Sequence, residues 1–86
     1  MALKYPILHM GCKPIEGYEI TPVTNPNMKI DGYPVITSFA WATSSASGTV
    51  YGNSKSTKID NLPVIIIDTT VAAYYIPPVN PTSISD

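Results

Sequence analysis

The sequence has one cysteine, one histidine and no arginine, and only 13% of its residues are charged. A single cysteine cannot form a disulfide within the chain, which excludes the disulfide-stapled scaffolds of small secreted proteins. The net charge is −1, so the dense cationic surface with arginine forks that binds nucleic acid is missing. We therefore expect no nucleic-acid partner.

The sequence also lacks a long hydrophobic run. Its longest strongly apolar stretch, Leu62 to Ile67, contains Pro63 and is far shorter than the roughly 20 residues that cross a bilayer as a helix. The first nine residues, MALKYPILH, lack the uninterrupted apolar core of a signal peptide. We expect a protein that has no transmembrane segment, is made in the cytoplasm and does not leave through a cleaved signal.

The chain length of 86 residues leaves room for a single domain, residues 1–86. A domain of this size without disulfides is marginally stable alone. Its hydrophobic content of 44% excludes a disordered tail, and its charge is well below the roughly 25% usual in soluble proteins. This combination indicates that a partner covers part of the surface.

One short phrase occurs twice, 29 positions apart (58 minus 29). Lys29–Ile36 reads KIDGYPVI, and Lys58–Ile65 reads KIDNLPVI. The central Asp-Gly and Asp-Asn steps accept positive φ at both positions, which a type I′ turn requires. We predict β-hairpins at about 28–37 and 57–66. The predicted turn residues are Asp31, Gly32, Asp60 and Asn61.

The proline after each turn agrees with a hairpin. If Ile30 and Tyr33 flank the first turn as a hydrogen-bonded pair, Pro34 lies opposite Lys29 in a non-hydrogen-bonded pair. Its nitrogen then points away from the partner strand, so the proline removes no bond within the hairpin and blunts its outer edge. The same geometry applies to Pro63 in the second copy.

Residues 1–20 have no room for a helix of ordinary length, because prolines and glycines interrupt them. We predict a short strand at Ile7–Met10, turns and extended chain at Thr21–Asn27, and a wide loop at Ala40–Gly48. Thr69–Ile76 is rich in β-branched and aromatic residues, which favour strand. The proline-rich C-terminal tail, 77–86, is expected to be extended.

A weaker echo links two further segments. Ile20–Pro26 reads ITPVTNP, and Ile76–Pro81 reads IPPVNP, with one residue deleted. Together with the two hairpins, this echo predicts an all-β fold with three similar β units in a pseudo-threefold repeat, the last unit truncated.

These hairpin units resemble those of the PAAR and PAAR-like proteins. The opening Ile7–Gly11, ILHMG, is similar to the leucine-histidine-x-glycine start of the injection-system subgroup, and Ile20–Ile30 is similar to its entry to the first hairpin. The resemblance covers roughly residues 7–68. It implies a small conical domain of short β-hairpins that forms the spike tip of a phage tail, a type VI secretion system or another contractile injection system. Such a cone caps a trimeric β-helical spike, one tip per trimer, with its point leading into the target membrane.

PAAR tips commonly hold a metal through histidines and a cysteine, and this chain departs from that pattern. Its Lys13–Gly17 stretch, KPIEG, keeps the proline and final glycine without the ligands. The candidates for a zinc or iron ion are His9 and Cys12, yet a closed tetrahedral site needs four ligands. Glu16 and Glu19 would complete it only as an unusual structural zinc site. The alternative is a packed histidine with an inert buried cysteine, and we expect no cofactor.

The sequence allows two enzymatic interpretations. Cys12 could act as a nucleophile with His9 as its base, but no third orienting group or oxyanion loop is recognisable. Asp31 and Asp60 could form an acid–base pair, although both residues suit the turns of type I′ loops. We therefore expect a protein that is not an enzyme and has no small-molecule substrate.

The remaining candidates are aromatic. Trp41, Tyr74 and Tyr75 are expected to be interface anchors, with Tyr74 and Tyr75 adjacent on a strand and facing opposite sides. The favoured function is a structural spike tip, incorporated into an injection particle or virion tail. The alternative is a small β-rich decoration or adhesion module that binds a capsid or carbohydrate through its aromatic residues, and a third class is a metalloenzyme.

Overall fold

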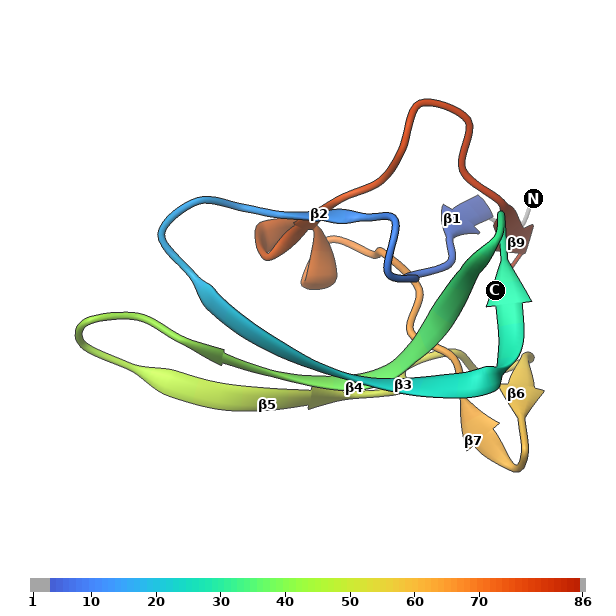
Figure 1. The fold of residues 1–86 in the computed structure, drawn as a ribbon, viewed down its shortest axis with the longest axis horizontal. Coiled ribbons are helices and arrows are strands. Elements are labelled where there is room, and N and C mark those ends of the chain that lie inside the picture. The colour runs from blue at the N-terminus through green and yellow to red at the C-terminus, as the bar shows by residue number, and fades with distance from the viewer. Residues whose placement is uncertain (1–3, 86) are drawn as a thin grey trace.

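The computed structural model describes residues 4–85, which form nine β-strands and one turn of 3₁₀ helix. The strands make four small antiparallel sheets (Figure 1). The largest sheet contains β3 (Glu19–Ile30), β4 (Tyr33–Ala42) and β5 (Ser47–Tyr51), in that order. The predicted all-β fold is confirmed, whereas the pseudo-threefold repeat stays a prediction.

The other three sheets are two-stranded. They pair β1 (Lys4–Pro6) with β9 (Ser83–Ser85), β2 (Lys13–Pro14) with β8 (Tyr75–Ile76), and β6 (Lys58–Ile59) with β7 (Leu62–Pro63). The first two join the N-terminal part of the chain to its C-terminal part. Within residues 4–85, no helix has the length and hydrophobicity to span a membrane.

Both predicted hairpins are present with the predicted turns. The central residues all have positive φ: Asp31 (55°), Gly32 (84°), Asp60 (51°) and Asn61 (66°). The flanking pairs are Ile30 with Tyr33 and Ile59 with Leu62, followed by Lys29 with Pro34 and Lys58 with Pro63. This is the register expected from the position of the prolines, although the strands of the second hairpin have only two residues each.

Of the turns and extended chain predicted at Thr21–Asn27, the extended chain is confirmed and the turns are wrong, because the whole segment lies within the 12-residue strand β3. β3 is an edge strand, where a proline whose nitrogen faces outward removes no bond of the ladder. Pro22 lies opposite Phe39 on β4. The turn-forming residues instead produce two register shifts, one after Val23 and one between Asn25 and Lys29.

The wide loop predicted at Ala40–Gly48 is also wrong, because β4 continues to Ala42 and β5 begins at Ser47. The alternation of large and small residues there suits a strand with one buried face. Only residues 43–46 form the connection, and Thr43 closes it: its N–H donates to the carbonyl of Ala46 at 2.7 Å.

At Thr69–Ile76, where the composition favoured strand, the structure has a 3₁₀ helix, η1 (Val71–Ala73), before the two residues of β8. The Asp68 carboxylate accepts hydrogen bonds from the N–H groups of Thr70 and Val71, both at 3.0 Å, and so starts this turn. Similarly, Ile7–Met10 is not a strand of its own; Ile7 and His9 form isolated bridges.

The core lies between the inner face of the β3–β4–β5 sheet and the segments that pass over it (Figure 1). One cluster gathers around Phe39, Leu8 and Val71, with Trp41 and Val50 packed against it. A second, smaller cluster contains Ile7, Val35, Val64 and Ile66. These residues bring both hairpins and the N-terminal segment into one packed body.

Candidate functional site

The predicted pair of metal ligands does not form a metal cluster. His9 and Cys12 are both buried, but Cys12 packs in the core with Leu8 and Tyr75, whereas the His9 ring stacks on Tyr33 with 5.4 Å between the ring centroids. In the part of the chain that the structure describes, no three histidine, cysteine or acidic side chains come together to hold a metal.

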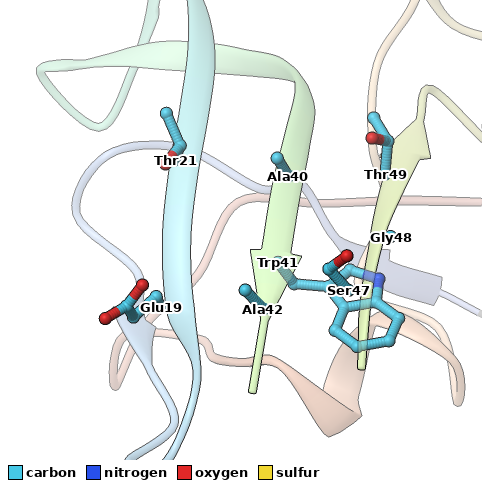
Figure 2. Close-up of a pocket in the computed structure, with 8 residues that line it drawn as sticks. All are labelled: Glu19, Thr21, Ala40, Trp41, Ala42, Ser47, Gly48 and Thr49. Atoms are coloured by element: carbon cyan, nitrogen blue, oxygen red, sulfur yellow. The ribbon is translucent and has the colours of Figure 1, made fainter. Parts of the chain in front are cut away.

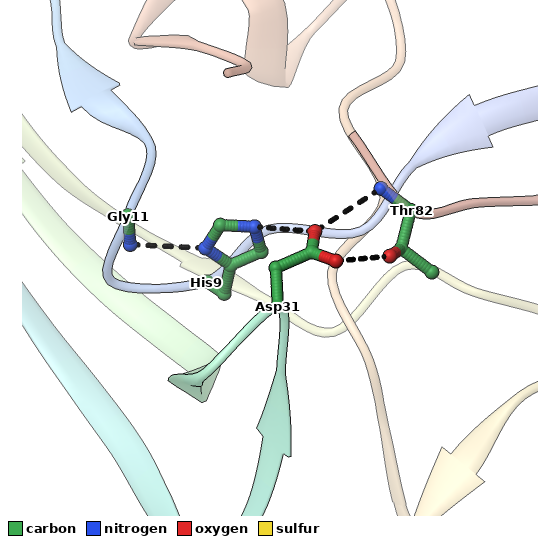
Figure 3. A network of polar contacts seen from close by, with 4 residues as sticks. All are labelled: His9, Gly11, Asp31 and Thr82. Atoms are coloured by element: carbon green, nitrogen blue, oxygen red, sulfur yellow. Dashed lines mark hydrogen bonds and ion pairs between the residues drawn. The ribbon is translucent and has the colours of Figure 1, made fainter. Parts of the chain in front are cut away.

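His9 instead belongs to a polar network with Asp31 and Thr82 (Figure 3). Its Nδ1 accepts a hydrogen bond from the Gly11 N–H at 2.9 Å, so the ring proton lies on Nε2. The Nε2 atom is 3.4 Å from Asp31 Oδ2. No group among residues 4–85 forms a hydrogen bond of good geometry with it. The carboxylate is thus the acidic group that faces the Nε2 side of the ring.

The Asp31 carboxylate joins the first hairpin to the C-terminal tail. The Thr82 hydroxyl donates to Oδ1 at 2.7 Å, and the Thr82 N–H donates to Oδ2 at 3.3 Å. These hydrogen bonds, chiefly that of the hydroxyl, hold the pKa of Asp31 below its usual range, with a smaller contribution from His9. Asp31 is therefore both a turn residue, as predicted, and a clasp between distant segments.

Asp60 has the same double role in the second hairpin. Its Oδ2 accepts a hydrogen bond from the Asn25 side-chain amide at 2.8 Å, and Asn25 in turn accepts one from the Asn27 N–H. This contact ties the second turn to the irregular part of β3. Each aspartate thus lies in a turn and is hydrogen-bonded to a different segment of the chain. We call these two contacts, Asp31 with Thr82 and Asp60 with Asn25, the clasps.

The environment of Cys12 favours its neutral thiol. Burial raises the pKa of Cys12, outweighing the effect of its backbone contact with His9, and the thiolate is the form that attacks an electrophile. Its neighbour Tyr75 is also desolvated, which raises the pKa of that phenol to about 12. The site thus gives Cys12 the properties of a packing residue.

The three aromatic interface candidates share one cluster. Trp41 stacks on Tyr74 with 5.3 Å between ring centroids, and Tyr18 meets both rings edge-on. Trp41 and Tyr74 are half-buried, whereas Tyr75 is only 4% exposed and packs edge-on against Phe39. Tyr74 ends the 3₁₀ helix, so the two tyrosines do not share a strand. Trp41 and Tyr74 are the two with surface to offer a partner.

The sequence interpretation missed the outer face of the β3–β4–β5 sheet, which we call the open face. The register places its residues in three cross-strand rows: Glu19–Ala42–Ser47, Thr21–Ala40–Thr49 and Val23–Ser38–Tyr51. The three β4 residues at the centre of these rows have small side chains, and Glu19 is the single charged residue of the nine. Most of the other residues are exposed. Along each strand these residues alternate with more buried ones, and this alternation is the sequence signal that indicates the open face.

Two grooves hollow the open face. The first, with a volume of about 300 Å³, is lined by Glu19 and by small residues, among them Ala40 and Thr49 (Figure 2). Trp41, whose indole packs on the inner face, borders it. The indole lies against Gly48, where an added Cβ would be 2.8 Å from the ring. The second groove, about 330 Å³, lies between Val23, Tyr51 and Leu62. These three apolar side chains are all exposed, so the open face offers a partner both hollows and apolar contacts.

The clasp at Asp31 predicts a specific dependence of stability on pH. Because its pKa is lower folded than unfolded, Asp31 contributes stability above about pH 4, its unfolded pKa, and this contribution is lost as pH falls through the folded pKa. We expect Asp31→Asn to be less stable than the wild type at pH 7 and to match it in strong acid. Urea unfolding across this pH range would measure the difference.

Thr82→Val is the matched variant, because it removes the hydroxyl but keeps the carboxylate and the backbone donor. Its Asp31 should titrate at a higher pKa than in the wild type, as measured by carboxyl NMR. An Asp31 pKa that is the same in both proteins would contradict the clasp.

Comparisons of the chain with models of protein families, with curated proteins and with solved structures find no match. The open face and the two clasps are therefore interpreted from their own geometry and chemistry.

Proposed function

We propose that this protein is the structural tip that caps the trimeric β-helical spike of a contractile injection system or phage tail. The observation that carries the proposal is the pair of hairpins with positive φ at both central turn residues and the same register beside the turn, built on the KIDGYPVI and KIDNLPVI phrases that resemble PAAR units. Both hairpins are fixed by clasps to other segments. A rigid small body of this kind suits a mechanical role.

The open face supports the proposal as a contact surface. It has one charged residue among nine and an uncovered array of small and β-branched side chains. An uncovered sheet surface of this kind can pack on another sheet, because side chains of two faces interdigitate at about 10 Å separation. In this function the spike covers the surface, contraction supplies the force, and the target membrane is met transiently. No substrate or cofactor takes part.

Stoichiometry is the test of this proposal. The chain would be co-expressed with a trimeric spike protein encoded in the same genome, and the purified complex weighed by native mass spectrometry. We expect one copy per spike trimer. A complex with three copies per trimer, or no complex with any such spike, would contradict the proposal.

A paired variant tests the role of the open face. Ala40 lies at the centre of the three cross-strand rows of the open face, so Ala40→Arg should abolish capture by the spike. Val79→Arg, at a position that is 95% exposed in the C-terminal tail, should leave capture unchanged. Equal capture of both variants would show that the spike binds elsewhere.

The second candidate is a decoration or adhesion module that binds carbohydrate. Its supporting observation is the pair of grooves, each at the lower end of the roughly 300–1,000 Å³ of ligand sites, with the exposed Tyr51 lining the second groove. An aromatic ring in such a groove can stack on the apolar face of a sugar. Titration with glycans, followed by NMR of the Tyr51 ring protons, would show saturable shifts under this alternative and none under the first.

A further inference from the structure

The two edges of the main sheet differ in their protection. The free edge of β3 carries Pro22 and Pro26 and two register shifts, which are devices that block pairing with another strand. β5 forms the other edge. Its five residues, SGTVY, contain no proline or charge, and its pairing with β4 has no register shift. It is the edge that remains open to another strand.

The register identifies the backbone groups that point outward. At the base of the loop, the Thr43 N–H donates to the Ala46 carbonyl, and bonded and non-bonded pairs alternate from there along an antiparallel ladder. Gly48 and Val50 therefore exchange bonds with β4. The outward N–H and C=O groups belong to Ser47, Thr49 and Tyr51. Within residues 4–85, no backbone hydrogen bond outside the strand ladders reaches these three residues.

We propose that β5 pairs antiparallel with β5 of a second copy of this chain, about a twofold axis through Thr49. In this register Thr49 faces Thr49 of the other copy, and Ser47 faces Tyr51 in both directions. All three outward N–H groups and all three outward C=O groups of each copy then find a partner. The result is a continuous sheet of six strands with both open faces on one side.

The side chains of β5 are self-complementary in this arrangement, which favours a second copy over an unrelated strand. Tyr51 is 72% exposed and projects from one end of β5, whereas the groove beside Ser47 and Gly48 lies at the other end. A twofold axis brings the tyrosine of each copy to the groove of the other, as an isologous interface requires. No charged residue opposes a like charge, because the charged residue of the open face, Glu19, lies on β3.

The wild-type test is sedimentation of the free full-length chain over a range of concentrations up to about 1 mM, where even a weak dimer with micromolar Kd is saturated. The mass should rise from 9.3 kDa to twice that value. A monomer at every concentration would overturn the proposal and leave the edge for a strand of another protein.

Charge substitutions at Thr49 test the register. Thr49→Lys places two lysines directly opposite each other across the axis, which is destabilising, and Thr49→Glu does the same with two carboxylates. Each variant should sediment as a monomer at a concentration where the wild type is dimeric. An equimolar mixture should restore a dimer containing one copy of each. Dimers of the separate variants, or monomers in the mixture, would contradict this register.

Thr21→Lys is the matched control, because Thr21 lies in the same cross-strand row as Thr49 but at the protected edge. It should remain dimeric. Circular dichroism would show that all three variants keep the wild-type fold, as expected for exposed positions. The inference concerns the free chain and does not depend on the proposed function: binding to a spike is measured with the spike present, and self-pairing without it.

Discussion

Phe39→Ala is expected to remove about 3–5 kcal/mol from the free energy of unfolding, the cost typical of deleting a buried phenylalanine ring. Phe39 is fully buried at the centre of the larger core cluster. Its ring meets Tyr74 and Tyr75 edge-on, with centroid distances of 5.7 and 5.1 Å, and such pairs add about 0.5–1.5 kcal/mol beyond burial. Total stability is about 5–15 kcal/mol in ordinary domains, so the variant should be largely unfolded at moderate urea.

Tyr51→Ala is the control for this prediction. It removes an aromatic ring of similar size from the same sheet, but from an exposed position, so we expect a change within about 0.5 kcal/mol. Urea denaturation followed by tryptophan fluorescence would measure both, at a concentration low enough to keep the chain monomeric. Equal destabilisation by the two substitutions would contradict the burial of Phe39.

Gly52→Ala is expected to destabilise the fold by about 3 kcal/mol, the upper part of the usual range for overpacking. A Cβ at this position would overlap the backbone carbonyl oxygen of Pro63, and a backbone atom cannot rotate out of the way. The junction between β5 and the second hairpin would have to open. Where the backbone conformation and the surrounding space tolerate a Cβ, replacing glycine by alanine stabilises a protein by about 0.4–1 kcal/mol. The sign of the change in unfolding free energy therefore shows whether the Cβ fits at position 52.

Gly17→Ala separates steric overlap from backbone strain. Gly17 has a φ of 97° but nothing within 4 Å of an added Cβ, so this variant carries the strain of a positive φ without a clash. Thermal unfolding should show a smaller loss for Gly17→Ala than for Gly52→Ala. A stabilising Gly52→Ala would show that the two segments do not approach as closely as described.

The hairpins could be predicted from the sequence because their information is local. A two-residue turn fixes its own φ values, and the turn then sets the register of the pairs beside it. The prediction of turns at Asp31 and Asp60 is confirmed for this reason. The strand at Thr21–Asn27 could not be recognised in the same way, because prolines are compatible with a strand only at an edge, and the edge position depends on the whole sheet.

The clasps and the open face depend on contacts between residues far apart in the chain. Asp31 and Thr82 are separated by 51 positions, and nothing in the sequence around either residue indicates the other. The sequence places His9 beside Cys12 as a candidate metal ligand, whereas in the fold its Nε2 faces Asp31 on the first hairpin at 3.4 Å. The 3₁₀ helix at Val71 likewise depends on the way Asp68 directs its carboxylate to the following N–H groups.

The pairing of β1 with β9, which sets Lys4 opposite Ser85, makes this chain suitable for circular permutation. A short glycine linker would join residues 4 and 85, and new ends could be opened in the exposed turn at Ser44 and Ser45. The same adjacency means that two fluorophores, attached at residues 4 and 85, would sit close enough for efficient energy transfer. Separation of the dyes would then report the opening of the β1–β9 pair in real time.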